Sequence, residues 1–198
     1  MRYLFVVLAL VCLALPAAAQ RGALTRPRNL SELVDQSETI LQGHVVTAVV
    51  EPHPEFSRIH TVVVSVRVEE SFKGAPGATF TFRQFIWDAR DRLDAAGYRK
   101  GQHLLLLMNP ASPIGLTSPA GIEQGRFRIM RDSAGREVAV NGAANRGLFV
   151  SLAAQLDKKG VRLSAEMSRV VSEQPAGPLR IDDLRQLLRE LRGRRGVP

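Results

Sequence analysis

The side chains best suited to chemistry gather in one short segment that follows a predicted strand. Asp88, Asp91 and Asp94 recur at three-residue spacing, so on a helix they would share a broad face. Carboxylate oxygens in such an arrangement are ligands that Ca²⁺ prefers. Arg90 and Arg92 stand between the acids, however, and no EF-hand loop is present. The segment is therefore predicted to be a mixed-charge surface helix rather than a calcium site.

Two aromatic residues flank this segment. One precedes the acids and the other follows them. Aromatic and arginine side chains beside each other are typical of binding hot spots. They are equally typical of a loop packed against the end of a barrel, so both interpretations stay open. The first interpretation predicts a ligand-binding surface formed by Trp87, Arg90, Asp91, Arg92 and Tyr98.

The four histidines show no metal-binding pattern. They are His44, His53, His60 and His103, and no two of them stand three or four residues apart. A zinc site needs three or four ligands that converge, and strands distant in sequence can bring them together, but the spacing does not indicate it. We therefore expect no metal site and no cofactor.

Motifs of common catalytic sites are also absent from the sequence. There is no G-x-S-x-G motif, no phosphate loop ending in G-K-[ST] and no dinucleotide-binding glycine pattern after a strand. No catalytic residues are predicted. The alternative is a hydrolase with an unrecognised polar site built from Asp91, His60 or His103.

The N-terminus has the three parts of a secretory signal peptide. A short basic start precedes the apolar run Leu4–Leu15, and the small residues Ala17–Ala19 follow. The run is shorter than the roughly 20 apolar residues that span a bilayer. We predict that residues 1–19 are cleaved after Ala19, that the protein is secreted or periplasmic, and that no transmembrane segment remains. The only cysteine, Cys12, lies in this leader, so the mature chain would have no disulfide.

The composition fits one compact, basic domain. Of the 198 residues, 45% are hydrophobic, which is enough for a real core. The 27 basic and 19 acidic side chains give a net charge of +8. Part of the excess falls on one predicted hairpin and part in the last twenty residues. Such a surface suits anionic envelope polymers, whereas export argues against nucleic acid as the ligand. The basic residues of the hairpin are Arg126, Arg128, Arg131 and Arg136.

The first two thirds of the chain show the alternation of strands. Val62, Val64, Val66 and Val68 share one face of the clearest strand. The segment His103–Met108 is almost wholly apolar, as in a central strand covered on both faces. The predicted strands are 39–51, 62–69, 79–85, 103–108, 126–130 and 136–140.

The last third shows helical spacing. Helices are predicted for 147–158, 164–171 and 181–192, the last with an apolar stripe of leucines. Asn29 is predicted to cap another short helix near the start of the mature chain. The expected organisation is a signal peptide (1–19), a β-barrel-like domain (29–142), a helical extension with a linker (143–178), and a C-terminal amphipathic helix with a basic tail (179–198).

Several short motifs follow one another in a recognisable order. They are Leu30–Val34, the Lys73-Gly74 turn, Gly101 before Leu104–Leu107, and Gly125-Arg126-Phe127. In this layout residues 30–141 resemble a family of uncharacterised exported bacterial proteins and are similar to netrin-like modules, which are closed β-barrels of the OB type. The resemblance implies a fold and a compartment but no activity. Some netrin-like proteins inhibit metalloproteases through an N-terminal cysteine, and no cysteine follows the predicted mature end here.

The sequence thus predicts an α+β, mainly β protein: an antiparallel OB/netrin-like barrel of five or six strands followed by C-terminal helices. The expected function is that of an exported, non-enzymatic binding or accessory module that contacts a protein or an anionic envelope polymer. Besides the hydrolase, a second alternative is an accessory subunit that docks through its C-terminal helix.

Overall fold

The structure is a computed structural model that describes residues 26–192. The predicted signal peptide, residues 1–19, lies outside the described residues. Among the helices of residues 26–192, none has the length and apolar character that crossing a bilayer would require.

One antiparallel sheet forms the centre of the molecule. Its strands occur in the order β3-β2-β1-β4-β5-β6-β7. Six of them match predicted strands within a few residues, whereas β7 has only two residues, too few for any alternation to reveal. The strands are β1 (Thr39–Pro52), β2 (His60–Lys73), β3 (Thr79–Phe85), β4 (His103–Met108), β5 (Arg126–Arg131), β6 (Glu137–Asn141) and β7 (Leu179–Arg180).

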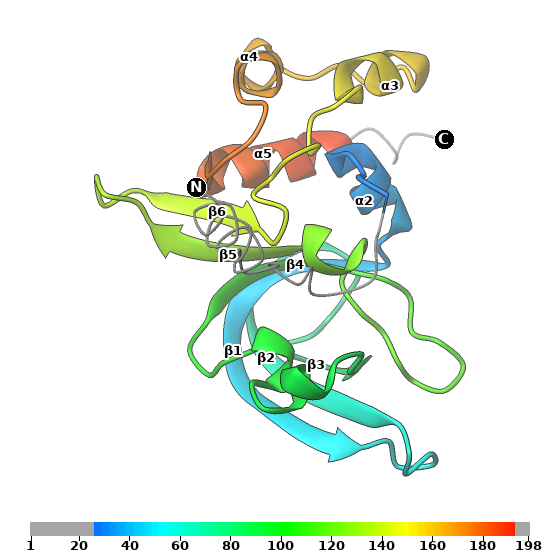
Figure 1. Cartoon of the computed structure of the whole chain (residues 1–198). Helices are drawn as coiled ribbons and strands as arrows, with labels where there is room; N and C mark the ends of the chain where they lie inside the picture. Colours follow the sequence, from blue (N-terminus) through cyan, green and yellow to red (C-terminus); the bar gives the residue numbers. More distant parts are fainter. Residues whose placement is uncertain (1–25, 193–198) are drawn as a thin grey trace, which may run out of the picture.

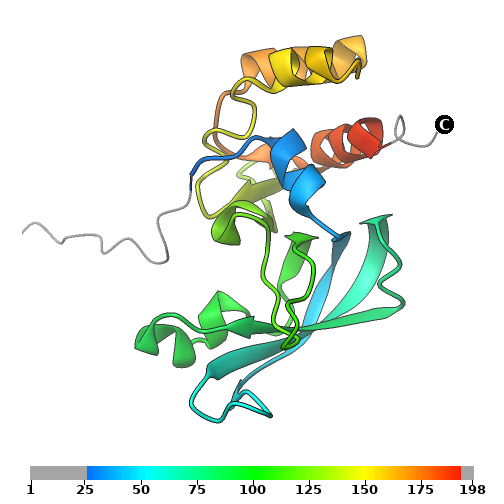
Figure 2. The same cartoon turned by 90° about the vertical axis from the view of Figure 1, so that its right-hand side faces the viewer.

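Helices cover one face of this sheet in two layers. The helices are α2 (Leu30–Gln36), α3 (Leu152–Lys158), α4 (Ala165–Glu173) and α5 (Ile181–Arg192). Helices α2 and α5 lie next to the sheet, and α3 and α4 lie beyond them (Figure 1, Figure 2). Three 3₁₀ turns lie in the connections: η1 (Ala89–Arg92), η2 (Ala95–Gly97) and η3 (Ile122–Gln124).

The expected closed barrel is wrong, because the sheet is open. Strands β3 and β7 lie at opposite ends of the strand order and do not pair with each other. In a small closed barrel one face of every strand points into a single interior. Here β4 buries both of its faces, because α2 and α5 cover one side and curled strands cover the other. The alternation in the sequence reports buried faces, and it does not report whether the edges of the sheet meet.

The hairpin of β1 and β2 is strongly irregular. Its register shifts at three points along β1. At one of them Gln42 pairs with Glu70 and Gly43 with Val68, so Glu69 is the extra residue of a β-bulge. Gly43 is required there, since a Cβ at this position would lie 2.1 Å from the carbonyl oxygen of Arg67. A bulge increases the twist of the strands and redirects the side chain of its extra residue. Here it turns Glu69 towards the helix side of the sheet, where it contacts two histidines.

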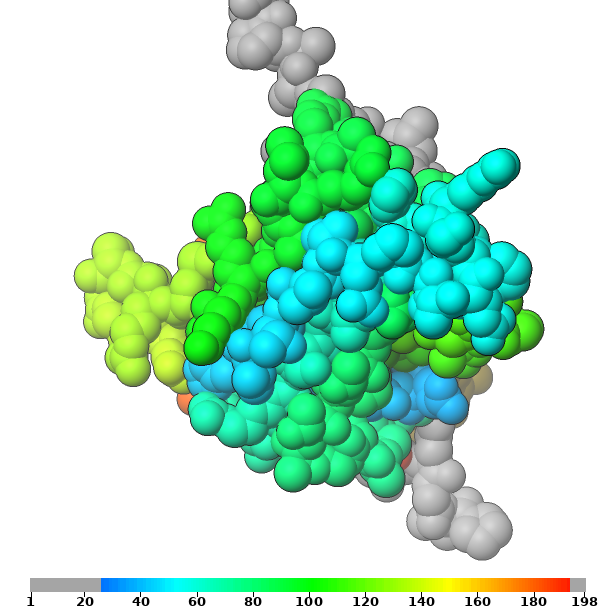
Figure 3. Space-filling view, turned by 90° about the horizontal axis from the view of Figure 1, so that it is seen from below, coloured from blue at the N-terminus to red at the C-terminus, as the bar shows by residue number. Residues whose placement is uncertain are grey.

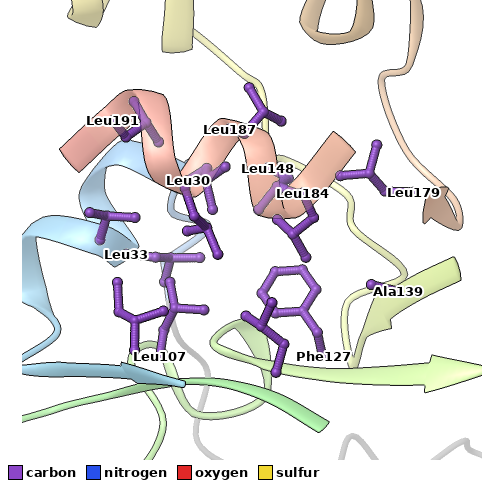
Figure 4. Close-up of a cluster of buried hydrophobic side chains, with 14 of the residues drawn as sticks. Leu30, Leu33, Leu107, Phe127, Ala139, Leu148, Leu179, Leu184, Leu187 and Leu191 are labelled. Atoms are coloured by element: carbon purple, nitrogen blue, oxygen red, sulfur yellow. The ribbon is translucent and has the colours of Figure 1, made fainter. Parts of the chain in front are cut away.

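The larger hydrophobic cluster lies between the sheet and the helices. Figure 4 shows the leucines of α5 above Phe127 of β5 and Leu107 of β4, with Leu30 and Leu33 of α2 beside them. Leu184, Leu187 and Leu188 of α5 are fully buried in this cluster. The apolar stripe predicted for 181–192 therefore packs on the protein's own sheet.

A second cluster fills the opposite face of the curled sheet. Val62, Val64 and Val66 are fully buried there, as the alternation predicted. Leu104 and Leu106 enter it from β4, while Leu105 and Leu107 of the same strand enter the helix-side cluster. The prediction that this strand is covered on both faces is confirmed.

Of two predictions for short helices, the structure confirms one and contradicts the other. Asn29 caps α2 as predicted and forms a capping box with Glu32. The single helix predicted across residues 88–96 is wrong. Two short 3₁₀ turns replace it, because Ala95 and Ala96 have positive φ angles of 52° and 54°, which a helix cannot contain.

Leu187→Ala should destabilise the fold by about 2–5 kcal/mol, because it leaves a cavity in a fully buried, well-packed cluster. Chemical denaturation followed by circular dichroism measures this difference. Leu93→Ala is the matched control, since Leu93 is 91% exposed and its loss should change stability by less than about 0.5 kcal/mol. Equal stability of Leu187→Ala and the wild type would show that α5 does not hold the sheet.

Candidate functional site

A cleft of about 740 Å³ lies at one end of the sheet. It lies where the end of β3, the η1–η2 segment, η3 and the start of β5 come together. The η1–η2 segment (green) protrudes on the face seen in Figure 3, which is the side away from the helices. Side chains that line the cleft include Phe85, Trp87, Arg99, Arg126, Arg128 and Arg146.

An aromatic pair forms one wall of the cleft. The rings of Phe85 and Trp87 meet edge to face, with centroids 4.8 Å apart and planes inclined by 82°. Phe85 is the last residue of β3, so the strand anchors the pair. Trp87 is nevertheless 69% exposed. Its ring face is therefore presented to solvent at the mouth of the cleft.

Arg126 forms the floor of the cleft. Its side chain is only 13% exposed, and it pairs with Glu123 at 2.6 Å. It also donates to the carbonyl oxygen of Ala96 at 2.8 Å, and its guanidinium lies 4.5 Å from the centre of the Tyr98 ring. The charge of Arg126 is therefore neutralised by a carboxylate of the protein itself, and its side chain connects η2 to β5.

Tyr98 lies beneath this arginine in the second cluster. It is 2% exposed, and its hydroxyl donates to the side chain of Gln84 at 3.0 Å. Burial raises the pKa of Tyr98 to about 12, and the nearby positive charge of Arg126 offsets only part of that rise. Tyr98 thus supports the cleft without facing it.

The unpaired charge around the cleft is positive. Arg99, Arg128 and Arg146 are exposed, and within residues 26–192 none of them forms an ion pair with a carboxylate. Asp91 and Asp94 also line the cleft, and Asp94 accepts a hydrogen bond from the backbone of Gly97 as the cap of η2. A ligand with negative charge would therefore meet three arginines that pair with no carboxylate of residues 26–192.

The five predicted binding residues divide into two groups. Trp87 and Asp91 line the cleft, and Tyr98 lies under its floor. Arg90 pairs with its neighbour Asp88 at 2.6 Å, and Arg92 contacts the ring of His60 at 3.0 Å, and neither lines the cleft.

The arginines across the cleft were not among the predicted binding residues. The sequence did mark Arg126 and Arg128 as part of a basic hairpin, and their alternation on β5 puts both on the cleft side. The other two arginines of that hairpin are paired locally, Arg131 with Glu137 and Arg136 with Asp132. The pairing of the strands brings β5 next to the loop that carries Trp87, and the spacing of residues in the sequence does not predict that pairing.

A second cluster of polar side chains lies on the helix side of the sheet. The pairing of β1 with β4 places His44 directly opposite His103, and their rings stack with centroids 4.2 Å apart. The bulge in β2 turns Glu69 towards both rings. One carboxylate oxygen lies 2.8 Å from Nδ1 of His44 and the other lies 2.9 Å from Nε2 of His103. We call these three residues the His-Glu-His cluster.

Two further residues connect the His-Glu-His cluster to α5. The amide nitrogen of Gln42 lies 2.9 Å from Nε2 of His103 and 3.4 Å from Glu69. Arg185 of α5 donates to the amide oxygen of Gln42 at 2.9 Å. Gln42 is only 2% exposed, so this link is shielded from water.

The pKa values of His103 and Glu69 are both lowered in this cluster. Burial lowers the pKa of His103, the charge of His44 lowers it further, and Glu69 partly opposes both effects. For Glu69, burial would raise the pKa, but the two histidines and the hydrogen bonds of His44 and Gln42 together lower it. The carboxylate is therefore held in its charged form.

Sequence spacing gave no sign of this cluster. His44, Glu69 and His103 lie on three different strands, and each offers one ligand atom within 4.8 Å of the others. Their convergence depends on the register of β1 with β4 and on one extra residue in β2. Neither follows from the local sequence.

Tyr98 should stay protonated well above the pH at which an exposed tyrosine ionises. Its pKa of about 12 exceeds the ordinary value of about 10, so its contribution to stability is complete below about pH 10 and is lost as the pH rises through about 12. Tyr3→Phe leaves Tyr98 as the only tyrosine, and tyrosinate absorbance then reports it alone. Ionisation near pH 10 with the fold intact would contradict the buried position.

The chain matches no protein-family model, no curated protein and no solved structure. The function proposed below therefore rests on the chain's own side chains.

Proposed function

We propose that the chain is an exported, non-enzymatic binding module whose cleft holds an acidic polysaccharide of the cell envelope. The observation that carries this proposal is the combination of an exposed tryptophan with three arginines that have no carboxylate partner among the described residues. The cleft volume of about 740 Å³ lies within the range of about 300–1,000 Å³ that is typical of ligand sites.

The two kinds of side chain have separate roles. The face of Trp87 offers a flat apolar surface against which a sugar ring packs, and Phe85 holds it in place. Arg99, Arg128 and Arg146 offer planar donors that suit carboxylate or sulfate groups along a chain. An acidic polysaccharide presents both features, since each sugar ring carries its own charge.

A polymer suits the cleft better than a protein partner does. A protein hot spot is centred on buried apolar anchors surrounded by a dry rim. Arginines, acids and glutamines make up much of this lining, and Trp87 is 69% exposed and not a buried anchor. Polar, hydrated contacts to a flexible polyanion agree with that lining.

The two alternatives fit the structure less well. The three residues suggested for a hydrolase do not share a site. Asp91 lines the cleft, His60 contacts Arg92, and His103 belongs to the His-Glu-His cluster on the helix side. Docking through the C-terminal helix would need the apolar stripe of α5, which is buried against the sheet.

An acidic polysaccharide should change the fluorescence of Trp87, the only tryptophan of the chain. With polygalacturonate as the probe, we expect a saturable blue shift, because the ring passes from water to a sugar surface. Hydrogen bonds to charged groups contribute about 1.5–3 kcal/mol, so Arg128→Ala should weaken binding by about ten-fold or more. Binding should also weaken at high salt.

Dextran, a neutral polymer, and the variant Arg169→Ala are the controls. Arg169 is an exposed arginine of α4 that does not line the cleft, so its removal tests the effect of net charge alone. The proposal fails if polygalacturonate leaves the emission unchanged, if dextran binds as well, or if both arginine variants lose affinity equally.

A further inference from the structure

The His-Glu-His cluster has a mismatch of donors and acceptors. Arg185 donates to the amide oxygen of Gln42, which fixes the orientation of that amide and points its NH₂ group at Nε2 of His103. A nitrogen that accepts this hydrogen bond carries no proton. The same nitrogen lies 2.9 Å from a carboxylate oxygen of Glu69, which is also an acceptor.

Protonation of His103 does not resolve the mismatch. A proton on Nε2 would satisfy Glu69, but it would then face the NH₂ group of Gln42 at 2.9 Å. A cation close to both acceptors removes the conflict. It takes the lone pair of His103 and the carboxylate, and the amide of Gln42 is then left to donate to Glu69 at 3.4 Å.

We propose that His44, Glu69 and His103 bind one divalent transition-metal ion of the Zn²⁺ class, through Nδ1, a carboxylate oxygen and Nε2 respectively. The three ligand atoms already lie within 4.8 Å of one another. Two imidazoles and one carboxylate favour zinc, copper or nickel, whereas Ca²⁺ and Mg²⁺ prefer ligand sets made of oxygen.

The geometry needs one small movement to accept the ion. Ligands about 2.05 Å from a tetrahedral zinc ion lie about 3.3 Å apart, and the two hydrogen-bonded pairs lie at 2.8 and 2.9 Å. The planes of the two rings are inclined by only 12°, and a metal binds in the plane of an imidazole, so one ring must turn. The side chain of His44 is 33% exposed and has room to do so, while that of His103 is 17% exposed and stays as the fixed ligand.

The surroundings support such an ion. Metal-binding side chains are usually held by a second set of hydrogen bonds, and Gln42 and Arg185 supply it here. Glu70, the residue after the bulge, pairs with Arg189 of α5 at 2.6 Å and keeps this part of β2 in position. Three protein ligands leave at least one coordination position open to solvent or to a donor of another molecule.

Calorimetric titration with Zn²⁺ at neutral pH tests the proposal on the untagged full chain. The background variant Cys12→Ser removes the only thiol, which would otherwise bind zinc. We expect one saturable site. His44→Gln and Glu69→Gln should each weaken it by about ten-fold or more, while His60→Gln, which changes a histidine outside the cluster, should leave it unchanged. Ca²⁺ should give no saturable heat.

Two further measurements make a negative result interpretable. Zn²⁺ should raise the melting temperature of the background chain and of His60→Gln but not of the two ligand variants, whose circular dichroism shows whether they fold. Co²⁺ bound to the background chain should give visible absorption bands. No saturable Zn²⁺ binding, no Co²⁺ bands, or equal affinity in all variants would each overturn the proposal. Polygalacturonate binding at the cleft is independent of every one of these outcomes.

Discussion

The pairing of β1 with β4 is the contact on which the rest of the structure depends. It joins the curled β1–β2–β3 part of the sheet to the β4–β5–β6–β7 part, and without it the chain would fall into two separate ribbons. Strand β4 is fully buried from Leu104 to Met108 and sends alternate side chains into both hydrophobic clusters. Burial of this kind contributes about 1.5–3 kcal/mol for each large apolar side chain. The sequence contains a single cysteine and so forms no internal disulfide, which leaves that burial to stabilise the fold.

The same pairing separates two regions of different character. On one side of the sheet, the cleft presents exposed arginine side chains and an exposed indole, on which the proposed binding of a polyanion rests. On the other side, the His-Glu-His cluster is compact, shielded by Gln42 and linked to α5 through Arg185. Both sites take their positions from strands and from the turns that follow them. Each site draws on at least three segments that are distant in sequence, so neither exists before the sheet forms.

The sequence predicted elements well and their assembly poorly. Alternating valines identified β2, the leucine run identified β4 as central, and the leucine stripe identified α5, because each pattern is local and periodic. The barrel was wrong because closure depends on whether β3 meets a distant strand, which no window of sequence contains. Trp87 and Asp91, which the sequence singled out because aromatic and charged residues gather there, line the cleft. Arg99, Arg146 and the convergence of His44 with His103 were missed because long-range register decides them.

The bulge at Glu69 also limits how the length of this protein can change during evolution. Glu69 and Glu70 are consecutive, yet both point to the helix side, since Glu69 contacts His103 and Glu70 pairs with Arg189 of α5. Deleting Glu69 would keep the other residues of β2 on their faces, but it would remove the carboxylate that lies between the two histidines. Because side chains alternate along a strand, adding or removing a residue between Val62 and Val68 would turn one part of β2 to the opposite face, and the buried valines or the pair of Glu70 with Arg189 would be lost. The loop between β1 and β2, residues 53–59, carries no such constraint, since it lies at the end of the hairpin. Insertions and deletions in related sequences should therefore collect at that tip and avoid the residues around Gly43 and Glu69.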